Sequence, residues 1–140
     1  MLGFMGHFEH TLDAKGRLIL PVRFRPDFER GGHLAHHFEG CLALWTPGEF
    51  ARQSAEMLNL SRSGDAASRN RARVWAGGVT PVDVDRQGRF PIPAFSRTFA
   101  ELGSDVVVLG SIDHIEVWNP ARYLERVAPA ESFFNGSDLV

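Results

Sequence analysis

A short motif that combines an acid and a base occurs twice along the chain. Asp13-Ala-Lys-Gly-Arg17 returns as Asp85-Arg-Gln-Gly-Arg89, 72 residues later. Aspartate in a turn accepts hydrogen bonds from backbone N–H groups, and glycine adopts positive φ without steric cost. Arginine on such a loop suits contact with a phosphate or with the O6 and N7 edge of guanine. Each motif therefore joins an easily formed loop to a cation that the loop itself does not need.

The motifs also have a purely structural interpretation, in which each Asp–Arg pair is an ion pair that closes its loop. The two interpretations are compatible, because the aspartate can shape the loop while the arginine works from it. Duplication favours a binding role, since a turn does not require arginine at the same offset twice. We expect Arg17 and Arg89 to read bases, with Lys15 and Arg86 as phosphate partners. The predicted DNA-binding residues are Asp13, Lys15, Gly16, Arg17, Asp85, Arg86, Gly88 and Arg89.

Apolar stretches on both sides of each motif predict the elements that position it. Strands are expected at 7–12 and 79–84 before the loops, and the apolar runs after the loops predict outgoing strands, so each motif becomes the polar tip of a β-hairpin. Pro91 restricts the second outgoing strand to an edge or a bulge. Further strands are expected at 33–38, 41–45, 106–110 and 115–118. Helices are expected at 22–30 (short, or kinked at Pro26), 46–60, 65–76, 94–102 and 119–127.

The order of elements recurs as well: hairpin, helix, two strands, helix. Trp45-Thr-Pro47 has its counterpart in Trp118-Asn-Pro120, at an offset of 73. One such unit is too small to bury a core alone, so we expect two units to share a barrel-like β core with helices outside and pseudo-two-fold symmetry. The expected boundaries are 5–60 for the first repeat, 61–78 for a helical connector, 79–127 for the second repeat, and 128–140 for a poorly ordered tail.

Composition limits the classes of function. The chain has 140 residues and a net charge of −2, so nucleic-acid binding requires a local cationic surface. Its single cysteine, Cys41, cannot form an intrachain disulfide and is expected in the core, in a reducing compartment. No signal peptide or membrane span is evident, which predicts a cytoplasmic protein.

The histidines raise the question of a metal site or an enzyme. In the group His33-x-x-His36-His37, positions 33 and 36 are expected on opposite faces of a strand, and no carboxylate or cysteine is expected at ligand spacing. Accordingly, neither a metal site nor a cofactor is predicted. The repeated loop has an acid and a base but lacks a nucleophile, so an enzyme is not favoured either. The second alternative is an oligomeric scaffold protein without sequence-specific DNA binding, in which the loops are merely ion-paired.

Taken together, the motifs resemble the MraZ family of bacterial transcriptional regulators. The resemblance is carried by both Asp-x-x-Gly-Arg motifs (the Asp–Gly–Arg loops) and by Arg25 and Arg97 after them. It is also carried by Val-Val-Val-Leu-Gly and Ile-Glu-Val-Trp near the end. It covers roughly residues 5–127. Arg25 and Arg97 themselves have either a structural or a DNA-contacting role.

The resemblance implies an α+β fold, built of two tandem half-barrels of the AbrB-like swapped-hairpin type. It also implies subunits assembled into a ring that binds double-stranded DNA at short G-rich direct repeats. Family members bind such repeats in the promoter of the division and cell-wall gene cluster, which usually includes their own gene, and they associate with the nucleoid. The two Asp–Gly–Arg loops would be the DNA-contacting elements, at Asp13 to Arg17 and Asp85 to Arg89.

Overall fold

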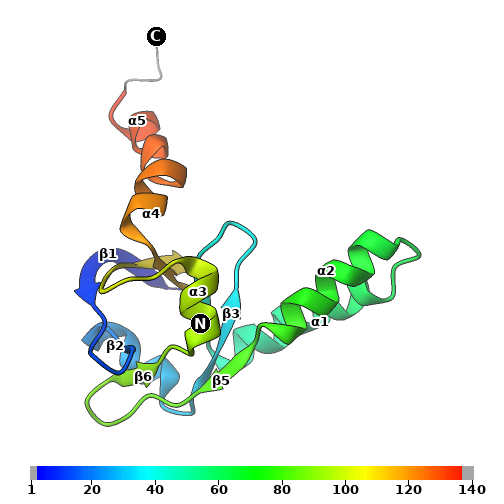
Figure 1. The fold of residues 1–140 in the computed structure, drawn as a ribbon, viewed down its shortest axis with the longest axis horizontal. Helices are drawn as coiled ribbons and strands as arrows, with labels where there is room; N and C mark the ends of the chain where they lie inside the picture. The colour runs from blue at the N-terminus through cyan, green and yellow to red at the C-terminus, as the bar shows by residue number, and fades with distance from the viewer. Residues whose placement is uncertain (1–2, 137–140) are drawn as a thin grey trace.

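The computed structural model describes residues 3–136, which form a mixed α+β structure around an antiparallel sheet (Figure 1). The sheet has six strands in the order β1-β7-β8-β4-β3-β5, and β2 and β6 form a separate two-stranded ribbon. The strands are β1 (Phe4–Thr11), β2 (Arg17–Ile19), β3 (Gly32–His36), β4 (Leu42–Trp45), β5 (Thr80–Val82), β6 (Arg89–Pro91), β7 (Asp105–Ile112) and β8 (Ile115–Trp118).

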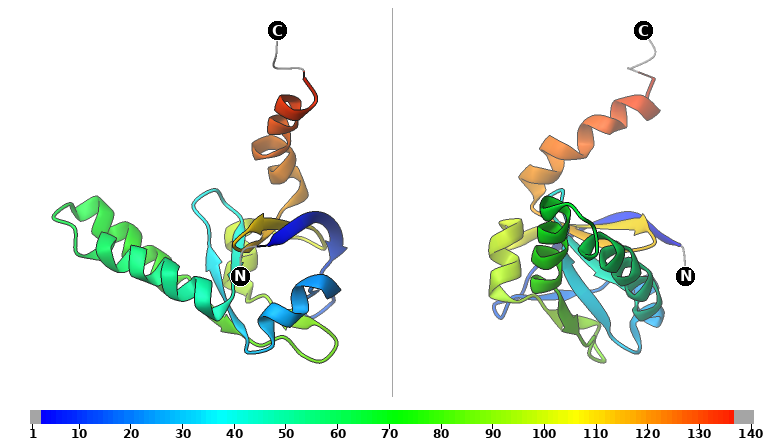
Figure 2. Two further views of the ribbon diagram at one scale, coloured as in Figure 1. Left: turned by 180° about the vertical axis from the view of Figure 1, so that it is seen from behind. Right: turned by 90° about the vertical axis from the view of Figure 1, so that its right-hand side faces the viewer.

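The helices lie outside this β structure. Helices α1 and α2 pack side by side in a hairpin that extends away from the sheet, while α4, η2 and α5 project in another direction (Figures 1 and 2). None of the helices in the described part of the chain is both long and apolar enough to cross a membrane. The helices are η1 (Val22–Phe28, a 3-10 helix), α1 (Pro47–Ser61), α2 (Ala66–Gly77), α3 (Ala94–Ala100), α4 (Pro120–Arg126), η2 (Ala128–Ala130, a 3-10 helix) and α5 (Glu131–Phe134).

Side-chain caps fix where the longer helices begin. Thr46, Asp65 and Asn119 each accept a hydrogen bond from a backbone N–H two or three residues later, at 3.3, 3.0 and 3.0 Å. Such caps satisfy N–H groups that the first turn of a helix leaves unpaired. The helices predicted at 46–60, 65–76 and 119–127 are confirmed to within one residue at each end.

Both prolines that interrupt the predicted elements are accommodated locally. Pro26 lies inside η1, which is a short 3-10 helix. Pro91 lies in β6, whose only ladder is with β2, so this strand is at an edge as predicted.

The hairpins predicted around the two motifs are wrong. β1 pairs with β7 and β2 pairs with β6, so the strands before and after the first loop form no ladder with each other. The hairpin is reduced to its turn, which the N–H of Asp13 closes by bonding the carbonyl of Arg17 at 3.0 Å. The bond from the N–H of Leu12 to the carbonyl of Ser104 (2.8 Å) keeps the incoming chain on the second half of the molecule until the turn begins.

Two strand pairings join the halves of the chain, and each is centred on a pair of residues that occupy equivalent positions in the two repeats. In the β2–β6 ribbon the central pair is Leu18 opposite Phe90, an offset of 72. In the β4–β8 ladder the central pair is Ala43 opposite Glu116, an offset of 73. The order of the six-stranded sheet is symmetric in the same sense, because β1, β7 and β8 of one side correspond to β5, β3 and β4 of the other.

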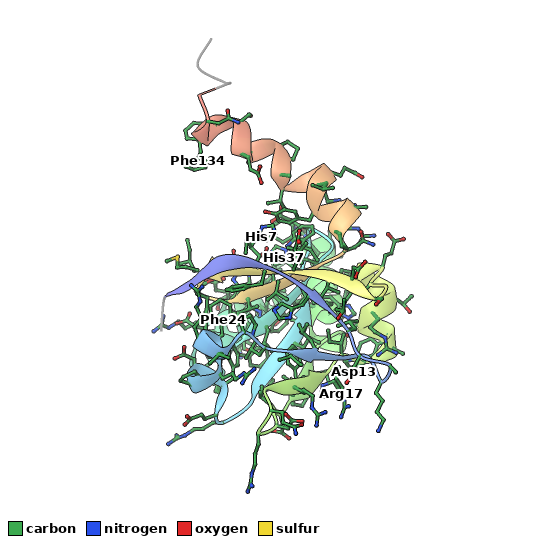
Figure 3. The ribbon with its side chains drawn as sticks, turned by 90° about the vertical axis from the view of Figure 1, so that its left-hand side faces the viewer. His7, Asp13, Arg17, Phe24, His37 and Phe134 are labelled. Carbon is green, nitrogen blue, oxygen red and sulfur yellow. The ribbon has the colours of Figure 1, made fainter. Side chains whose placement is uncertain are left out.

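The main core lies between the inner face of the sheet and the β2–β6 ribbon, and η1 also contributes to it. Leu18 and Phe90, the central residues of the two ribbon strands, are fully buried there, and so are Leu20 and Ile92 directly after the strands. The buried phenylalanines of η1, Phe24 among them, fill the same core (Figure 3). Each loop is thus anchored to a strand that the core holds in place.

The tail predicted at 128–140 contains helical turns in its first part. Residues 128–134 continue from α4 as η2 and α5, and the N–H of Ala130 bonds the carbonyl of Val127 at 3.0 Å. The side chains of Phe133 and Phe134 remain exposed. Residues 137–140, which belong to the same prediction, lie outside the described part of the chain.

Candidate nucleic-acid interface

The first loop is built by one carboxylate. Oδ1 of Asp13 accepts the backbone N–H groups of Lys15 and Arg17, both at 2.9 Å. Its Oδ2 accepts Nε–H of Arg17 at 2.7 Å. Gly16 supplies the positive φ, +74°, that the turn requires. Asp13 therefore shapes the backbone and orients the arginine at the same time.

The second loop repeats this arrangement bond for bond. Oδ1 of Asp85 accepts the N–H groups of Gln87 and Arg89 at 2.9 Å each, and its Oδ2 accepts Nε–H of Arg89 at 3.0 Å. Gly88 has a φ of +82°. The ion pairs of the structural interpretation are therefore present. Each uses Nε, and within residues 3–136 the terminal amino groups of Arg17 and Arg89 make no hydrogen bond.

The backbone hydrogen bonds hold both carboxylates in their charged form. The N–H of Arg17, followed by its guanidinium and the N–H of Lys15, keeps the pKa of Asp13 below its ordinary value. The N–H of Arg89 has the same effect on the pKa of Asp85, with the guanidinium and the N–H of Gln87 adding to it. Both loops therefore keep their shape at neutral pH.

Each loop is covered by an arginine from the other half of the chain. The guanidinium of Arg97 lies against Gly16, and that of Arg25 lies against Gly88, so closely that a Cβ on either glycine would overlap it. Both arginines are also tied to backbone carbonyls: Nε of Arg25 donates to Leu20 at 2.9 Å, and Nη1 of Arg97 donates to Ile92. Arg25 and Arg97 thus have a structural role in the described molecule.

The β2–β6 ribbon places Arg17 and Arg89 on one face. Leu18 and Phe90 point into the core, so the residues beside them, including both arginines, point outward. The ladder pairs Arg17 with Pro91 and Ile19 with Arg89, which separates the two arginine Cα atoms by about 8 Å, two residues along the strands and one strand across. Their side chains are 30 % and 31 % exposed.

The charge around the ribbon differs from that of the whole chain. Two carboxylates, Asp13 and Asp85, stand among six cations in the loops and over them: Lys15, Arg17, Arg25, Arg86, Arg89 and Arg97. Lys15 and Arg86 are exposed. Since the chain has a net charge of −2, the remainder of the molecule is acidic. The local cationic surface that a nucleic-acid role requires is therefore available.

A second cluster, which the sequence did not reveal, lies on the outer face of the sheet. Ligand atoms of His37, Cys41 and Glu116 all lie within 4.8 Å of one another. The expectation that no carboxylate or cysteine stands at ligand spacing to this histidine group is therefore wrong. Spacing along the chain could have drawn attention to Cys41, but Glu116 comes from β8 and only the pairing of β8 with β4 brings it close. Figure 3 shows His37 at the upper strands, beside His7, and Asp13 and Arg17 below them.

Comparison with known proteins identifies the family. The sequence pattern of the "MraZ protein" family matches residues 3–72 and 76–138. The chain belongs to the MraZ family. Proteins named "Transcriptional regulator MraZ" are similar along most of their length. The one from Dictyoglomus turgidum is 38 % identical over 122 residues, with 87 % of this chain and 83 % of its own length covered.

Two further relatives of the same name extend the comparison. The MraZ of Roseiflexus castenholzii is 37 % identical, with 86 % of this chain and 83 % of the relative covered. The MraZ of Pediococcus pentosaceus is 36 % identical, with 94 % and 92 % covered. Membership of a family whose named relatives are transcriptional regulators supports a role in transcription regulation for this MraZ family member.

Proposed function

We propose that this protein is a transcriptional regulator that binds double-stranded DNA through its two Asp–Gly–Arg loops. The observation that carries the proposal is that two loops with identical bonding present Arg17 and Arg89 on one face of the β2–β6 ribbon. A loop-closing ion pair explains the aspartates. It leaves the outward placement of both arginines unexplained.

The dimensions of the ribbon suit the major groove of B-DNA, which is about 12 Å wide and admits a two-stranded β-ribbon. With Cα atoms about 8 Å apart, both arginines enter the same groove. Because Nε of each is held by an aspartate, Nη1 and Nη2 are the groups that face the DNA. Two adjacent N–H groups match O6 and N7 of guanine, which agrees with a G-rich target.

Lys15 and Arg86 stand beside the reading arginines and contact phosphates in this proposal. Both are exposed in the two-residue turn of their loop, Arg86 as its first residue and Lys15 as its second. Neutralised phosphates release counterions, so binding weakens steeply as salt rises, whatever the sequence. Asp13, Gly16, Asp85 and Gly88 contribute by setting the loop geometry.

We further propose that the halves are two AbrB-like repeats of the swapped-hairpin type, at 5–60 and 79–127, related by an approximate two-fold axis and joined by a connector at 61–78. The central pairs of the two ladders, Leu18 with Phe90 and Ala43 with Glu116, support this. An axis through both pairs relates the loops to each other. Arg25 and Arg97, each of which covers the loop of the other half, are related by the same symmetry.

One subunit offers only two reading arginines, so useful affinity requires several subunits on several repeats. We propose a homo-oligomeric ring that binds short G-rich direct repeats in its own promoter, upstream of the division and cell-wall genes, and that resides on the nucleoid. Large exposed apolar side chains are available for subunit contacts, notably Phe38 (92 % exposed) and Phe134 (86 %).

The test is a fluorescence anisotropy titration of promoter DNA at two salt concentrations, with scrambled G-rich boxes as the control DNA. We expect binding that requires the boxes, weakens steeply with salt and is lost in the variant with both Arg17→Ala and Arg89→Ala. Arg62→Ala, at the turn of the α1–α2 hairpin, is the matched control and should bind normally. Unchanged binding by the double variant would refute the proposed interface.

The same titration decides the alternative of an oligomeric scaffold. A folded, oligomeric protein without preference for the boxes would make assembly the main function. The duplicated arginines would then be structural ion pairs only.

A further inference from the structure

The outer face of the sheet carries a cluster of unlike donor groups that DNA binding does not use. His37 and Cys41 flank the turn between β3 and β4, and Glu116 lies on β8. One nitrogen, one sulfur and one carboxylate oxygen lie within 4.8 Å of one another. Cys41 is fully buried, Glu116 is nearly so (7 % exposed), and His37 is half-buried at the edge. The donors come from both halves of the chain.

Glu116 is held in place by two neighbours. Its Oε1 accepts Nε1–H of Trp118 at 2.9 Å, and its Oε2 lies 2.8 Å from Nε2 of His114. The other ring nitrogen of His114 lies 2.7 Å from Oδ1 of Asp113. A histidine between two carboxylates is oriented from both ends. His114 therefore fixes the Glu116 carboxylate, as the partners that surround a metal ligand do.

Two arginines of α4 hold the turn that carries the other donors. Nη1 of Arg122 donates to the carbonyl of Gly40 at 2.8 Å, and Nη1 of Arg126 donates to the carbonyl of Glu39 at 2.6 Å. These bonds lie between His37 and Cys41 in the sequence, so they fix both ends of the turn. The donor positions are set by the fold before any ligand arrives.

We propose that His37, Cys41 and Glu116 bind a divalent transition metal of the zinc type. A thiolate, an imidazole and a carboxylate are the ligands that Zn²⁺ takes in proteins, whereas Mg²⁺ and Ca²⁺ select oxygen. Zinc–ligand bonds of about 2.0–2.3 Å place tetrahedral donor atoms about 3.3–3.7 Å apart, so donors within 4.8 Å converge after small side-chain movements. A water molecule completes the coordination.

Binding exchanges a proton for the metal at Cys41. The S–H bond breaks, the proton passes to solvent, and the thiolate bonds the metal ion. Without the metal, burial and the nearby carboxylates of Glu116 and Glu39 raise the pKa of Cys41 well above its ordinary value, so the group is a neutral thiol. The bound ion would tie the β3–β4 turn of the first half to β8 of the second half.

The test uses the full chain without an affinity tag, titrated with Co²⁺ as a spectroscopic substitute for Zn²⁺. We expect one cobalt per chain, thiolate-to-cobalt charge transfer in the near ultraviolet, and the intense visible bands of a tetrahedral site. Excess Zn²⁺ should remove these bands. Absence of the charge-transfer absorption in the folded chain overturns the proposal, because Cys41 is the only thiol.

Variants then assign the other ligands. Cys41→Ser should abolish charge transfer, and Glu116→Gln and His37→Asn should each weaken cobalt binding by at least 100-fold. His114→Gln, a positioning residue, should weaken it by roughly 10- to 100-fold. His10→Ala, on the first strand, is the matched control and should bind like the unmodified chain. If Glu116→Gln and His37→Asn bound cobalt as tightly as the unmodified chain does, the assignment of these ligands would be overturned.

X-ray absorption of the zinc-loaded, unmodified chain keeps the proposal testable if a variant does not fold. One sulfur among nitrogen and oxygen neighbours supports it, and a shell without sulfur overturns it. The outcome is independent of DNA binding, because metal binding is measured without DNA and His37 lies apart from Asp13 and Arg17 (Figure 3).

Discussion

The two Asp–Gly–Arg loops and the two turns on the outer face of the sheet both belong to the duplicated pattern, yet they differ in how alike the copies are. The loops agree in every hydrogen bond of their aspartates, with distances that differ by no more than 0.3 Å. The turns at 37–41 and 110–114 do not agree. At equivalent positions they carry Cys41 and His114, and next to these Gly40 and Asp113.

This difference follows from what each region faces. The loops point outward on one face of the ribbon, where, in the proposed function, two like contacts would serve two like elements of a target. The outer-face turns approach each other across the β4–β8 ladder, whose centre pairs Ala43 with Glu116. Near such a centre, equivalent side chains would meet and compete for the same space. Unlike residues can instead form one shared cluster, here with Cys41 from one half and Glu116 from the other.

The largest expected effect tests whether the loops are equivalent in binding. Arg17→Ala and Arg89→Ala should each cost about 1–3 kcal/mol of affinity for G-rich boxes, and the double variant about 2–6 kcal/mol. The costs should be equal for the two loops, because their geometry is the same. Anisotropy titrations at fixed salt measure this. A large effect of one arginine and none of the other would break the comparison.

The next effect tests the exchanged cover. Gly16→Ala and Gly88→Ala place a Cβ at positive φ and against the guanidinium of Arg97 or Arg25. Each should lower the free energy of unfolding by about 1–3 kcal/mol, measured by urea denaturation.

The control for this pair is Gly48→Ala in the first turn of α1, where nothing lies within 4 Å of the added Cβ. This variant should be neutral or slightly stabilising, because alanine favours helix. If a loop variant were as stable as the control, the covering guanidinium would be able to move aside without lowering the free energy of unfolding.

A smaller effect should separate the two halves at their helix starts. Thr46→Ala removes the cap of α1 and should cost about 0.5–2 kcal/mol of stability. Asn119→Ala removes the equivalent cap of α4, and it also removes the bond that Nδ2 donates to the carbonyl of Glu101 at 2.6 Å. It should therefore cost about 0.5–1.5 kcal/mol more. Equal costs in urea denaturation would contradict the expected asymmetry.

The smallest effect is a dependence of stability on pH. Folding lowers the pKa of Asp13 and Asp85, so their contribution is present above the unfolded value of about 3.9 and is lost as pH falls through the folded value. The variant with both Asp13→Asn and Asp85→Asn should melt below the unmodified chain at pH 6. The difference in Tm should close as the pH falls below about 4. The effect is small because exposed ion pairs contribute little.

Local chemistry made the loops and the main helices predictable. Asp13 and Gly16 specify a turn, and Thr46, Asp65 and Asn119 specify helix starts, because each acts on backbone groups only a few residues away. The alternation of buried and outward residues in β2 was not visible in the same way, because the run after Arg17 is apolar throughout.

Pairing between distant segments was not predictable in the same way. The hairpin prediction failed because an apolar strand after a turn carries no sign that β6, rather than β1, is its partner. The roles of Arg25 and Arg97 depend on which loop their side chains cover, and each covers the loop of the other half. The place of Glu116 beside His37 and Cys41 was unpredictable for a similar reason, because it depends on the ladder between β4 and β8.

Each loop is covered by an arginine of the other half, and this also determines when the first loop can be completed during synthesis of the chain. Gly16 leaves the ribosome long before Arg97, which follows it by 81 residues. At about 5–20 residues per second, the first loop waits roughly 4–16 s for the residue that covers it. Meanwhile β2 has no β6 to pair with, and Leu18 and Leu20 are left without their core. A nascent chain of this length therefore exposes an apolar edge strand, the kind of segment that chaperones bind, until its second half has emerged.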